Sequence, residues 1–544
     1  MSPASPAALR ICSSRRLCAV GTLALVALTA SACGGGGAPS AADNKPKYAA
    51  GGTLTVAQDQ DPGALDPQLT ALSATRSVAR FAYDTLLNTD ENGGLVSGLA
   101  DKWEATTTKA TYHLREGITC SDGSPLTATD VAANYTFVGN PKNASPLLGL
   151  GAPAGVQASA DDAARTVTLT SPTPSPFLLQ TTGTGLMIVC KKGTTDRKKL
   201  AAATDGTGMY SLTESVPNDH YTFTRRADYA WGPNGTTSTY DGAPEKVVVK
   251  IVPNASTAMN LLLAKQVNLA TGADADAARA AAANLKGQGA ATPAGELWFN
   301  QAPGHPGADP AVRKALVGSL DAKQVGSVLT GGTGVPSKGL VTLEPRVCKG
   351  DTVAGTMPVV ALPEAEQLLD GAGWTKGADG MRAKAGKPLA FKFMVPSTLG
   401  ENATPGGELL AESWKKLGVS VQLSSPSSTG LQTVLFSTGD WDAGFIPLTV
   451  TLPTQYAGFV SGPTPPTGTN FAHISNPVYD AALKKASGLT GDQACAEFDK
   501  GEKALIANAD VSPLVNKQTL IYANGAEFRI DPDGIVPQSL RLLG

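Results

Sequence analysis

Alternating apolar and polar residues predict several short β-strands. Residues 112–114 alternate as a half-buried strand does, and in residues 388–395 every second side chain is apolar. Residues 245–252 (EKVVVKIV) are apolar on both faces, which is typical of a strand in the middle of a sheet. Further strands are predicted at residues 51–58, at the start of 164–179, at 220–225 and at 419–423.

Apolar residues spaced four apart predict helices in the second half of the chain. Residues 309–321 place Val312, Leu316 and Leu320 on one helical face. Helices are also predicted at residues 364–374, 407–417 and 476–486. Strands and helices alternate, and the 60 glycines and 38 prolines supply many turns, so we expect a mixed α/β protein.

One complete βαβ unit is readable in this half. Strands at 388–395 and 419–423 flank the helix at 407–417, which ends at Gly418, a residue suited to the position after a helix. Two strands joined in this way should be parallel and connected by a right-handed crossover.

The stretch 112–131 (YHLREGITCSDGSPLTATDV) combines three local signals. A strand leads into a turn at residues 121–123, and a helix then begins where Thr127 or Thr129 can cap it and Asp130 suits its first turn. Taken alone, this pattern predicts local structure without chemistry.

Length and charge restrict the class of protein. The chain has 544 residues, too many for one hydrophobic core and enough for two or three domains. Only 17% of residues are charged and the formal net charge is −2, so we expect no nucleic-acid partner.

The N-terminus resembles an export signal. Arg10, Arg15 and Arg16 precede an apolar run at residues 17–28 that is short for a membrane span. Residues 30–33 (ASAC) then resemble a lipobox, which predicts a signal peptide over residues 1–33 and lipidation of Cys33. An ordinary signal peptide cleaved near residue 32 and a short membrane anchor are the alternatives, and the arginine pair leaves the Sec and twin-arginine routes open.

Residues 34–50 are rich in Gly, Ala, Ser and Pro, so we expect a flexible tether. No later stretch is apolar for long enough to cross a bilayer. The expected location is the outer face of the cell membrane, with the lipid as the sole membrane attachment.

The stretch 112–131 also resembles the signature of family 5 of the bacterial extracellular solute-binding proteins, the peptide- and nickel-type receptors of ABC importers. Other segments in register with that family are YDTL with GLADKW at 83–103, GTGMY at 206–210, ELWFN at 296–300, the VRKA helix near 312, LLDGAGW at 368–374 and NPVYD at 476–480.

The resemblance implies a type II periplasmic-binding-protein-like fold, with two α/β lobes, a hinge and an extra subdomain in the first lobe. It implies a receptor that binds a peptide or other small solute between its lobes and works with an ABC permease and ATPase subunits, as a monomer and without a cofactor. A ligand-sensing lipoprotein of the same fold and a secreted hydrolase are the alternatives. The implied divisions are 51–297 for the first lobe with its subdomain at about 72–188, 298–512 for the second lobe and 513–544 for the return to the first.

The resemblance also implies a set of ligand-binding residues. The loop DQDPGALDP at 59–67 corresponds to the family's cleft-edge loop, residues 296–300 cross between the lobes, and Trp441 begins the segment that holds the peptide in relatives. The implied contacts are Gln58, Asp59, Asp61, Trp298, Asn300, Trp441, Phe445, Leu448 and Thr451.

That segment departs from the peptide-binding pattern. After Trp441-Asp442, relatives carry a tryptophan and an acidic residue that pairs with the peptide's amino group, whereas residues 443–456 (AGFIPLTVTLPTQY) contain neither. Either the register shifts and an acid is supplied elsewhere, for example by Asp59 or Asp61, or the ligand has no free ammonium group to pair.

The cysteines after Cys33 suggest disulfides. Cys120, Cys190, Cys348 and Cys495 remain in an exported chain, which favours oxidation, and three pairings are open. Because the implied lobe boundary separates the first two from the last two, we expect Cys120–Cys190 and Cys348–Cys495.

Catalytic and metal motifs are missing from the sequence. The chain has four dispersed histidines and no G-x-S-x-G, HExxH or CxxC motif. We therefore expect neither a metal site nor an enzyme.

Overall fold

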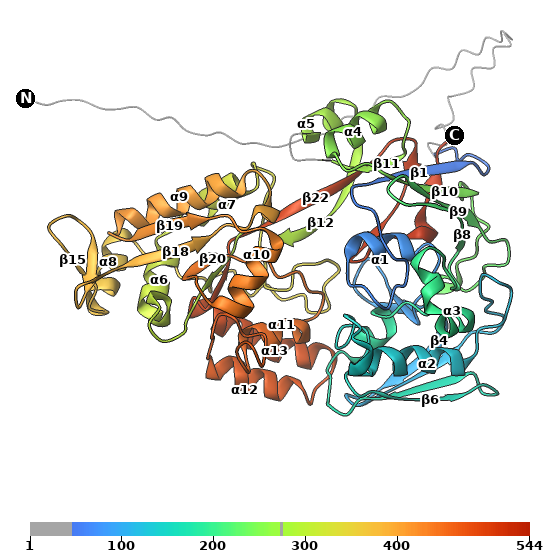
Figure 1. The fold of residues 1–544 in the computed structure, drawn as a ribbon, viewed down its shortest axis with the longest axis horizontal. Helices are drawn as coiled ribbons and strands as arrows, with labels where there is room; N and C mark the ends of the chain where they lie inside the picture. Colours follow the sequence, from blue (N-terminus) through green and yellow to red (C-terminus); the bar gives the residue numbers. More distant parts are fainter. Residues whose placement is uncertain (1–45, 273–275) are drawn as a thin grey trace, which may run out of the picture. The chain divides into compact units, whose positions relative to one another are not determined.

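The computed structural model describes residues 46–272 and 276–544 (Figure 1). The predicted signal peptide, Cys33 and residues 34–45 of the tether lie outside these ranges. Residues 47–544 form one compact unit. No helix in the described ranges is both long and apolar enough to cross a membrane.

The largest sheet organises the first lobe. Its strand order is β12-β22-β11-β1-β10-β9-β8, and β14 pairs with β22. The apolar strand β10 lies inside the sheet, parallel to β1 and antiparallel to β9, which confirms the central position predicted for it. The bounds are β1 Thr53–Gln58, β8 Tyr210–Val216, β9 His220–Arg225, β10 Lys246–Ile251, β11 Leu269–Thr271, β12 Lys286–Pro293, β14 Val335–Pro336 and β22 Val515–Ala523.

A smaller antiparallel sheet of order β4-β5-β7-β6 adds a subdomain, with helix α2 packed against it. The predicted helix start is confirmed with Thr127 as the cap, because Thr127 and Asp130 form a reciprocal capping box. Thr129 instead donates from its hydroxyl to Asp162, 2.9 Å away. The bounds are β4 Ala100–Ala105, β5 Lys109–Leu114, β6 Gln157–Asp161, β7 Thr166–Thr170 and α2 Ala128–Gly139.

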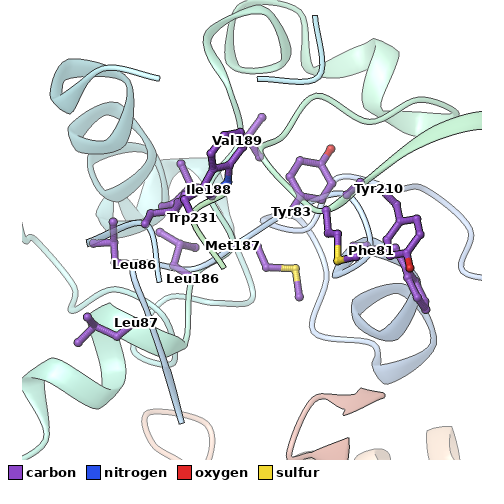
Figure 2. Packing of buried hydrophobic residues seen from close by; sticks show 14 of the residues in the cluster. Phe81, Tyr83, Leu86, Leu87, Leu186, Met187, Ile188, Val189, Tyr210 and Trp231 are labelled. Carbon is purple, nitrogen blue, oxygen red and sulfur yellow. The ribbon is translucent and has the colours of Figure 1, made fainter. Parts of the chain in front are cut away.

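The YDTL and GTGMY segments meet in the first-lobe core (Figure 2). Gly206 and Gly208 lie against the chain at Ala82 and Tyr83, and a Cβ on either glycine would come within 2.4 Å of these neighbours. The glycines therefore permit close packing of two chain segments, which agrees with a structural role and not with a phosphate loop.

The second lobe is built on a sheet of order β19-β18-β20-β13-β21. The predicted βαβ unit is present: β18 and β19 are parallel and are joined through α9, and Gly418 after this helix has φ +80°. Helix α9 begins at Ala403, four residues before the predicted start, since Pro405 is tolerated in a first turn. The bounds are β13 Glu296–Phe299, β18 Ala390–Met394, β19 Ser420–Ser424, β20 Ala443–Phe445, β21 Val511–Pro513 and α9 Ala403–Lys416.

Alternation along β13 separates the two cores of this lobe. Leu297 and Phe299 face a cluster that includes residues of α6 to α9, while Trp298 faces a cluster with residues of α11 to α13. The helices are α6 Pro310–Gly318, α7 Ala322–Leu329, α8 Leu362–Gly371, α11 Pro453–Val460, α12 Pro477–Ala486 and α13 Gly491–Ala507.

Two backbone crossings connect the sheets of the lobes. One lies between β12 and β13 at Ala294–Gly295, and the other lies between β21 and β22 at Leu514. The crossings bind each other, because the Leu514 amide donates to the Gly295 carbonyl at 2.8 Å and the Ala294 amide donates to the Val515 carbonyl at 3.2 Å. The change of sheet thus falls just before the division expected at 297/298.

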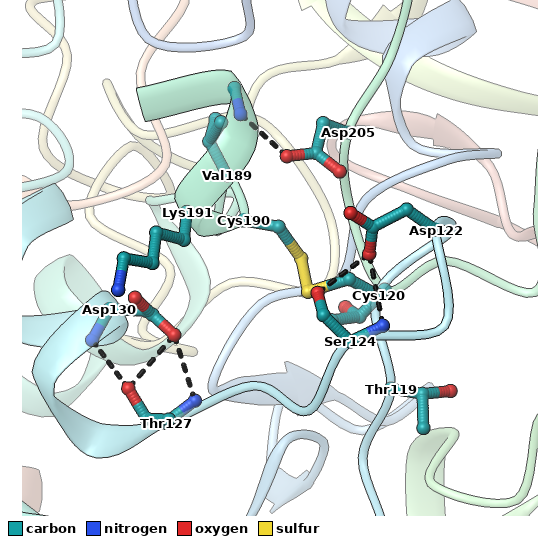
Figure 3. The surroundings of a disulfide bond; sticks show 12 residues. Thr119, Cys120, Asp122, Ser124, Thr127, Asp130, Val189, Cys190, Lys191 and Asp205 are labelled. Carbon is teal, nitrogen blue, oxygen red and sulfur yellow. Dashed lines mark hydrogen bonds between the residues drawn. A yellow bond between two sulfur atoms is a disulfide. The ribbon is translucent and has the colours of Figure 1, made fainter. Parts of the chain in front are cut away.

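Both predicted disulfides are present. Cys120 joins Cys190 beside the start of α2 (Figure 3), and Cys348 joins Cys495 in the second lobe. Near the second bond, Phe177 of the first lobe is 1% exposed and its ring centre lies 5.7 Å from that of Phe498. The lobes therefore also touch away from the two crossings.

Candidate functional site: a cleft lined by both lobes

A cavity of about 1420 Å³, counting the part open to solvent, is lined by both lobes. The first lobe contributes helix α1 (Ser73–Ala79) with residue 80 after it, the YDTL segment, residues 147–187 in part, and the C-terminal residues 531–538. The second lobe contributes Pro345, Val347, the run 449–452 and Gln455.

The first-lobe wall carries two ion pairs. Arg76 and Arg80, one helical turn apart, bind Asp533 at 3.1 Å and Asp531 at 2.6 Å. The two arginine side chains are only 12% and 11% exposed, so each guanidinium depends on its carboxylate. Burial tends to raise the pKa of Asp533, but Arg76 and Arg80 outweigh it and the pKa is lowered.

A further carboxylate, Asp84, lines the same wall without an arginine against it. It accepts hydrogen bonds from the Tyr229 hydroxyl at 3.0 Å, the Thr207 hydroxyl at 3.0 Å and the Trp231 indole at 3.2 Å, and Gln538 approaches at 3.4 Å. Burial dominates over these neutral donors and raises the pKa of Asp84 to about 6. Its oxygens are thus already occupied by protein donors.

The second-lobe wall carries no charged side chain among the described residues that line the cavity. Gln455 shapes it: the side-chain oxygen accepts from the amide of Thr451 at 3.0 Å, from its hydroxyl at 3.1 Å and from the amide of Leu452 at 3.1 Å. These bonds hold the 449–452 run at the start of α11.

Glu296 supports this run from behind, at the first residue of β13. It is 2% exposed and accepts from the Leu448 amide at 2.8 Å and from the Tyr456 hydroxyl at 2.5 Å. Burial raises the pKa of Glu296 to about 8, and the buried Glu502 adds to the shift. Glu296 is therefore predominantly a neutral acid at pH 7.

Three of the residues expected to bind ligand lie at cavities. Thr451 lines the cleft. Gln58 and Asp59 line a neighbouring first-lobe chamber, where the Gln58 amide is bonded to the Ala74 carbonyl and to the Ser77 hydroxyl. Asp61 is engaged by the Asn218 amide and the Tyr221 hydroxyl, and together with the Gly63 amide these donors outweigh burial and lower its pKa.

The other expected residues, apart from the half-buried Leu448, lie in the interior of the second lobe. Phe445 is fully buried with its ring 5.1 Å from Phe393, so we no longer propose it as a cleft residue. Trp298 and Trp441 belong to the aromatic cluster around Phe471. The remaining two bind within their own lobe: the Asn300 side chain donates to the Trp441 carbonyl at 3.0 Å, and the Leu448 amide donates to the Glu296 carboxylate at 2.8 Å.

Sequence reasoning missed the charged residues of the first-lobe wall: Arg76, Arg80, Asp84, Asp531 and Asp533. The spacing of the two arginines places them on one helical face, but their partners are 451 and 457 residues away in the chain. No local pattern identifies such pairs.

The His–Asp contact closest in type to a catalytic dyad is in the second lobe. His305 Nδ1 lies 2.8 Å from Asp442, and Nε2 faces the Asn300 amide at 3.4 Å. Nε2 thus faces an amide group, where a hydrolase triad would place a nucleophilic hydroxyl or thiol. Among the described residues, no group of three or more His, Cys, Asp or Glu side chains is arranged to hold a metal ion.

The family model described as bacterial extracellular solute-binding proteins, family 5 middle region, matches residues 94–467. The chain is 25% identical over 505 residues to the periplasmic murein peptide-binding protein MppA of Escherichia coli, covering 86% of this chain and 87% of MppA. It is 28% identical over 454 residues to protein XP55 of Streptomyces lividans, covering 78% and 77%.

Solved structures show the same fold. The substrate-binding protein CtaP of Listeria monocytogenes superposes with a TM-score of 0.75 at 18% identity, covering 90% of this chain and 99% of CtaP. The oligopeptide-binding protein AppA of Bacillus subtilis, solved with a nonapeptide, has a TM-score of 0.69 at 19% identity, covering 92% and 100%.

Proposed function

We propose that this chain, which belongs to family 5 of the bacterial extracellular solute-binding proteins, captures an uncharged peptide-like solute in its cleft and delivers it to an ABC import permease. The family match covers the core of the protein, and MppA, CtaP and AppA are each named as binding proteins.

The cavity shared by two lobes is the observation that carries the proposal. Two bonded crossings form a hinge on which the lobes can turn, and a ligand that touches both walls favours the closed arrangement. A permease that recognises the closed form then receives loaded receptors in preference to empty ones.

The ligand class follows from the charges in the cleft. A buried ammonium or carboxylate on the ligand needs a counter-charge, because otherwise its desolvation is not compensated. The first-lobe charges are paired with each other or saturated by neutral donors, and the lining contributed by the second lobe is uncharged. A solute with blocked or absent charged ends fits these walls. Among the described residues that line the cleft and the neighbouring chamber, Asp59 of the chamber is the carboxylate left to pair an amino group.

Export and anchoring are part of the proposal. Lipidation of Cys33 would place the receptor on the outer face of the membrane beside its permease. Cys33→Ser should release the protein into the medium; retention in the membrane fraction would show that another segment anchors it.

Mass spectrometry of small molecules that co-purify with the native protein tests the receptor function. We expect an uncharged solute that is released unchanged on denaturation. Added back at a hundred times its dissociation constant, it should stabilise the fold by about 2.7 kcal/mol, which a melting curve detects. Steady conversion of the solute into a product would contradict the proposal.

The charge of the solute is tested separately. If a free-amino peptide binds tightly, Asp59→Asn should abolish that binding, whereas Asp61→Asn should leave it, since Asp61 is held by Asn218 and Tyr221. Tight binding that survives both changes would refute the assignment of an uncharged ligand.

A further inference from the structure

A second chamber lies against the large sheet of the first lobe. It encloses about 1170 Å³, counting its open part, and is bounded by the ends of β1, β11, β12 and β22, by α1 and by the C-terminal hairpin β24–β25 (Ile530–Asp531 and Gly534–Ile535). All its described lining residues belong to the first lobe.

The sheet surface in this chamber is made of small or apolar side chains. Ala290 and Thr292 on β12, with Thr519 and Ile521 on β22, lie on one face because side chains alternate along a strand. Ala290 is paired with Thr519, so at this point neither strand contributes a large side chain. The rest of the apolar lining is Val56, Ala57, Ala74, Ile530, Pro532 and Ile535.

The polar groups of the chamber are largely engaged. Gln58 donates to the Ala74 carbonyl and accepts from Ser77, and Arg76 is bound to Asp533. Asp59 also lines the chamber, but it is exposed to solvent. A ligand group placed against the sheet therefore meets methyl groups and satisfied amides, which favours an uncharged alkyl or aryl group there over a polar one.

The chamber adjoins the interlobe cleft. Arg76, Asp531, Pro532 and Asp533 line both cavities, so these four residues form a shared rim. A solute in the cleft can extend across this rim without leaving the protein. Its extension would then touch β12 and β22, the strands that lead into the two crossings.

We propose that this chamber is a specificity subsite that takes an uncharged alkyl or aryl group of the solute bound in the cleft, and that Ala290 sets the size of that group. This inference rests on the proposed receptor function, since it assigns one part of the receptor's ligand.

The test uses the uncharged fluorophore N-phenyl-1-naphthylamine with the purified full-length protein. We expect saturable binding to wild type and a dissociation constant at least about tenfold higher in Ala290→Phe, since the new ring fills the space of the ligand group. Ala291→Phe is the matched control, because Ala291 lies on the same strand, on the other face and outside the chamber lining. It should change the dissociation constant by less than about twofold.

Melting curves establish that the variants are folded, and Thr519→Leu provides a smaller filling of the same space. Thr519→Leu should weaken binding by less than Ala290→Phe. Binding to Ala290→Phe that equals wild type, an equal loss in Ala291→Phe, or no saturable binding to wild type would each overturn the inference.

The co-purified solute separates this inference from the receptor function. If wild type retains a solute that Ala290→Phe binds equally well, the subsite is refuted and the receptor stands. If the protein steadily converts the solute into a product while the fluorophore binds and is lost in Ala290→Phe, the receptor function is refuted and the chamber stands only as an apolar binding site, without its role as a receptor subsite.

Discussion

The two walls of the cleft differ in the number of ionisable side chains that they carry. The first-lobe wall carries two arginines and three aspartates, yet both arginines are bound to aspartates and the third aspartate is saturated by neutral donors. The second-lobe wall carries hydroxyl, amide and apolar groups, and its nearby carboxylate Glu296 is buried behind the wall and protonated at neutral pH.

The difference shows that a wall with many charged side chains need not present an unpaired charge to a ligand. The ion pairs of the first lobe fix the C-terminal hairpin against α1, and they present dipoles and no net charge to the cleft. The second lobe presents the hydroxyl and amide groups of residues 449–452 and Gln455. Both walls therefore select against an isolated charge, although only one of them is free of ionisable side chains.

Breaking one ion pair of the first wall should have the largest effect. Asp531→Asn leaves the Arg80 guanidinium, 11% exposed, without its bidentate partner. A buried charge that loses its partner costs about 3 kcal/mol or more in unfolding free energy, which urea denaturation measures. The variant also turns the wall cationic, so it should acquire affinity for an anionic solute.

Glu366→Gln provides the matched control for that measurement. The Lys376–Glu366 pair lies in the second lobe and is 39% and 34% exposed, so its loss should cost less than about 1 kcal/mol. Equal losses of unfolding free energy in the two variants would show that the Arg80–Asp531 pair stabilises the fold no more than an exposed ion pair does.

A pH series tests the second wall. The pKa of Glu296 is about 8 in the folded protein and 4.5 for an ordinary glutamate, so between these values the folded form keeps a proton that the unfolded chain releases. Its contribution is complete below pH 4.5 and is lost as pH rises to 8, by roughly 1.4 kcal/mol per pH unit. Between pH 6 and 8, above the pKa of Asp84, Glu296→Gln should remove most of this slope from the unfolding free energy, whereas the exposed Glu412→Gln should leave it unchanged. A slope in this range that is as steep in Glu296→Gln as in wild type would assign the proton to another group.

Local sequence signals predicted much of the framework. The βαβ unit, the cap at Thr127 and the central strand β10 each depend on neighbours within a few residues. The disulfides followed from the lobe division that the family resemblance implied.

Family motifs did not distinguish structural from ligand-binding residues. Arg313 of the VRKA helix and Asn476 of NPVYD both bind the fully buried Asp510, at 2.7 and 2.8 Å, and so hold the second lobe together. Phe445 was assigned to the pocket by register, but it ends β20 with its ring in the core. Side-chain direction beyond a strand end depends on the turn that follows, which spacing alone does not determine.

The smallest expected effect concerns Gln455, which organises the second wall. Gln455→Ala removes the acceptor for three donors of Thr451 and Leu452, and loss of such a helix-start interaction costs about 1 kcal/mol. Gln455→Glu keeps the acceptor and stability close to wild type, but it places a carboxylate in a wall that has none. A free-amino tripeptide should then bind more tightly to Gln455→Glu than to wild type, and its N-acetylated form should show no gain, as measured by calorimetry at pH 7. If the acetylated tripeptide gains equally, the effect comes from loop geometry, and the absence of charge on the second wall is not what limits binding of an ammonium group.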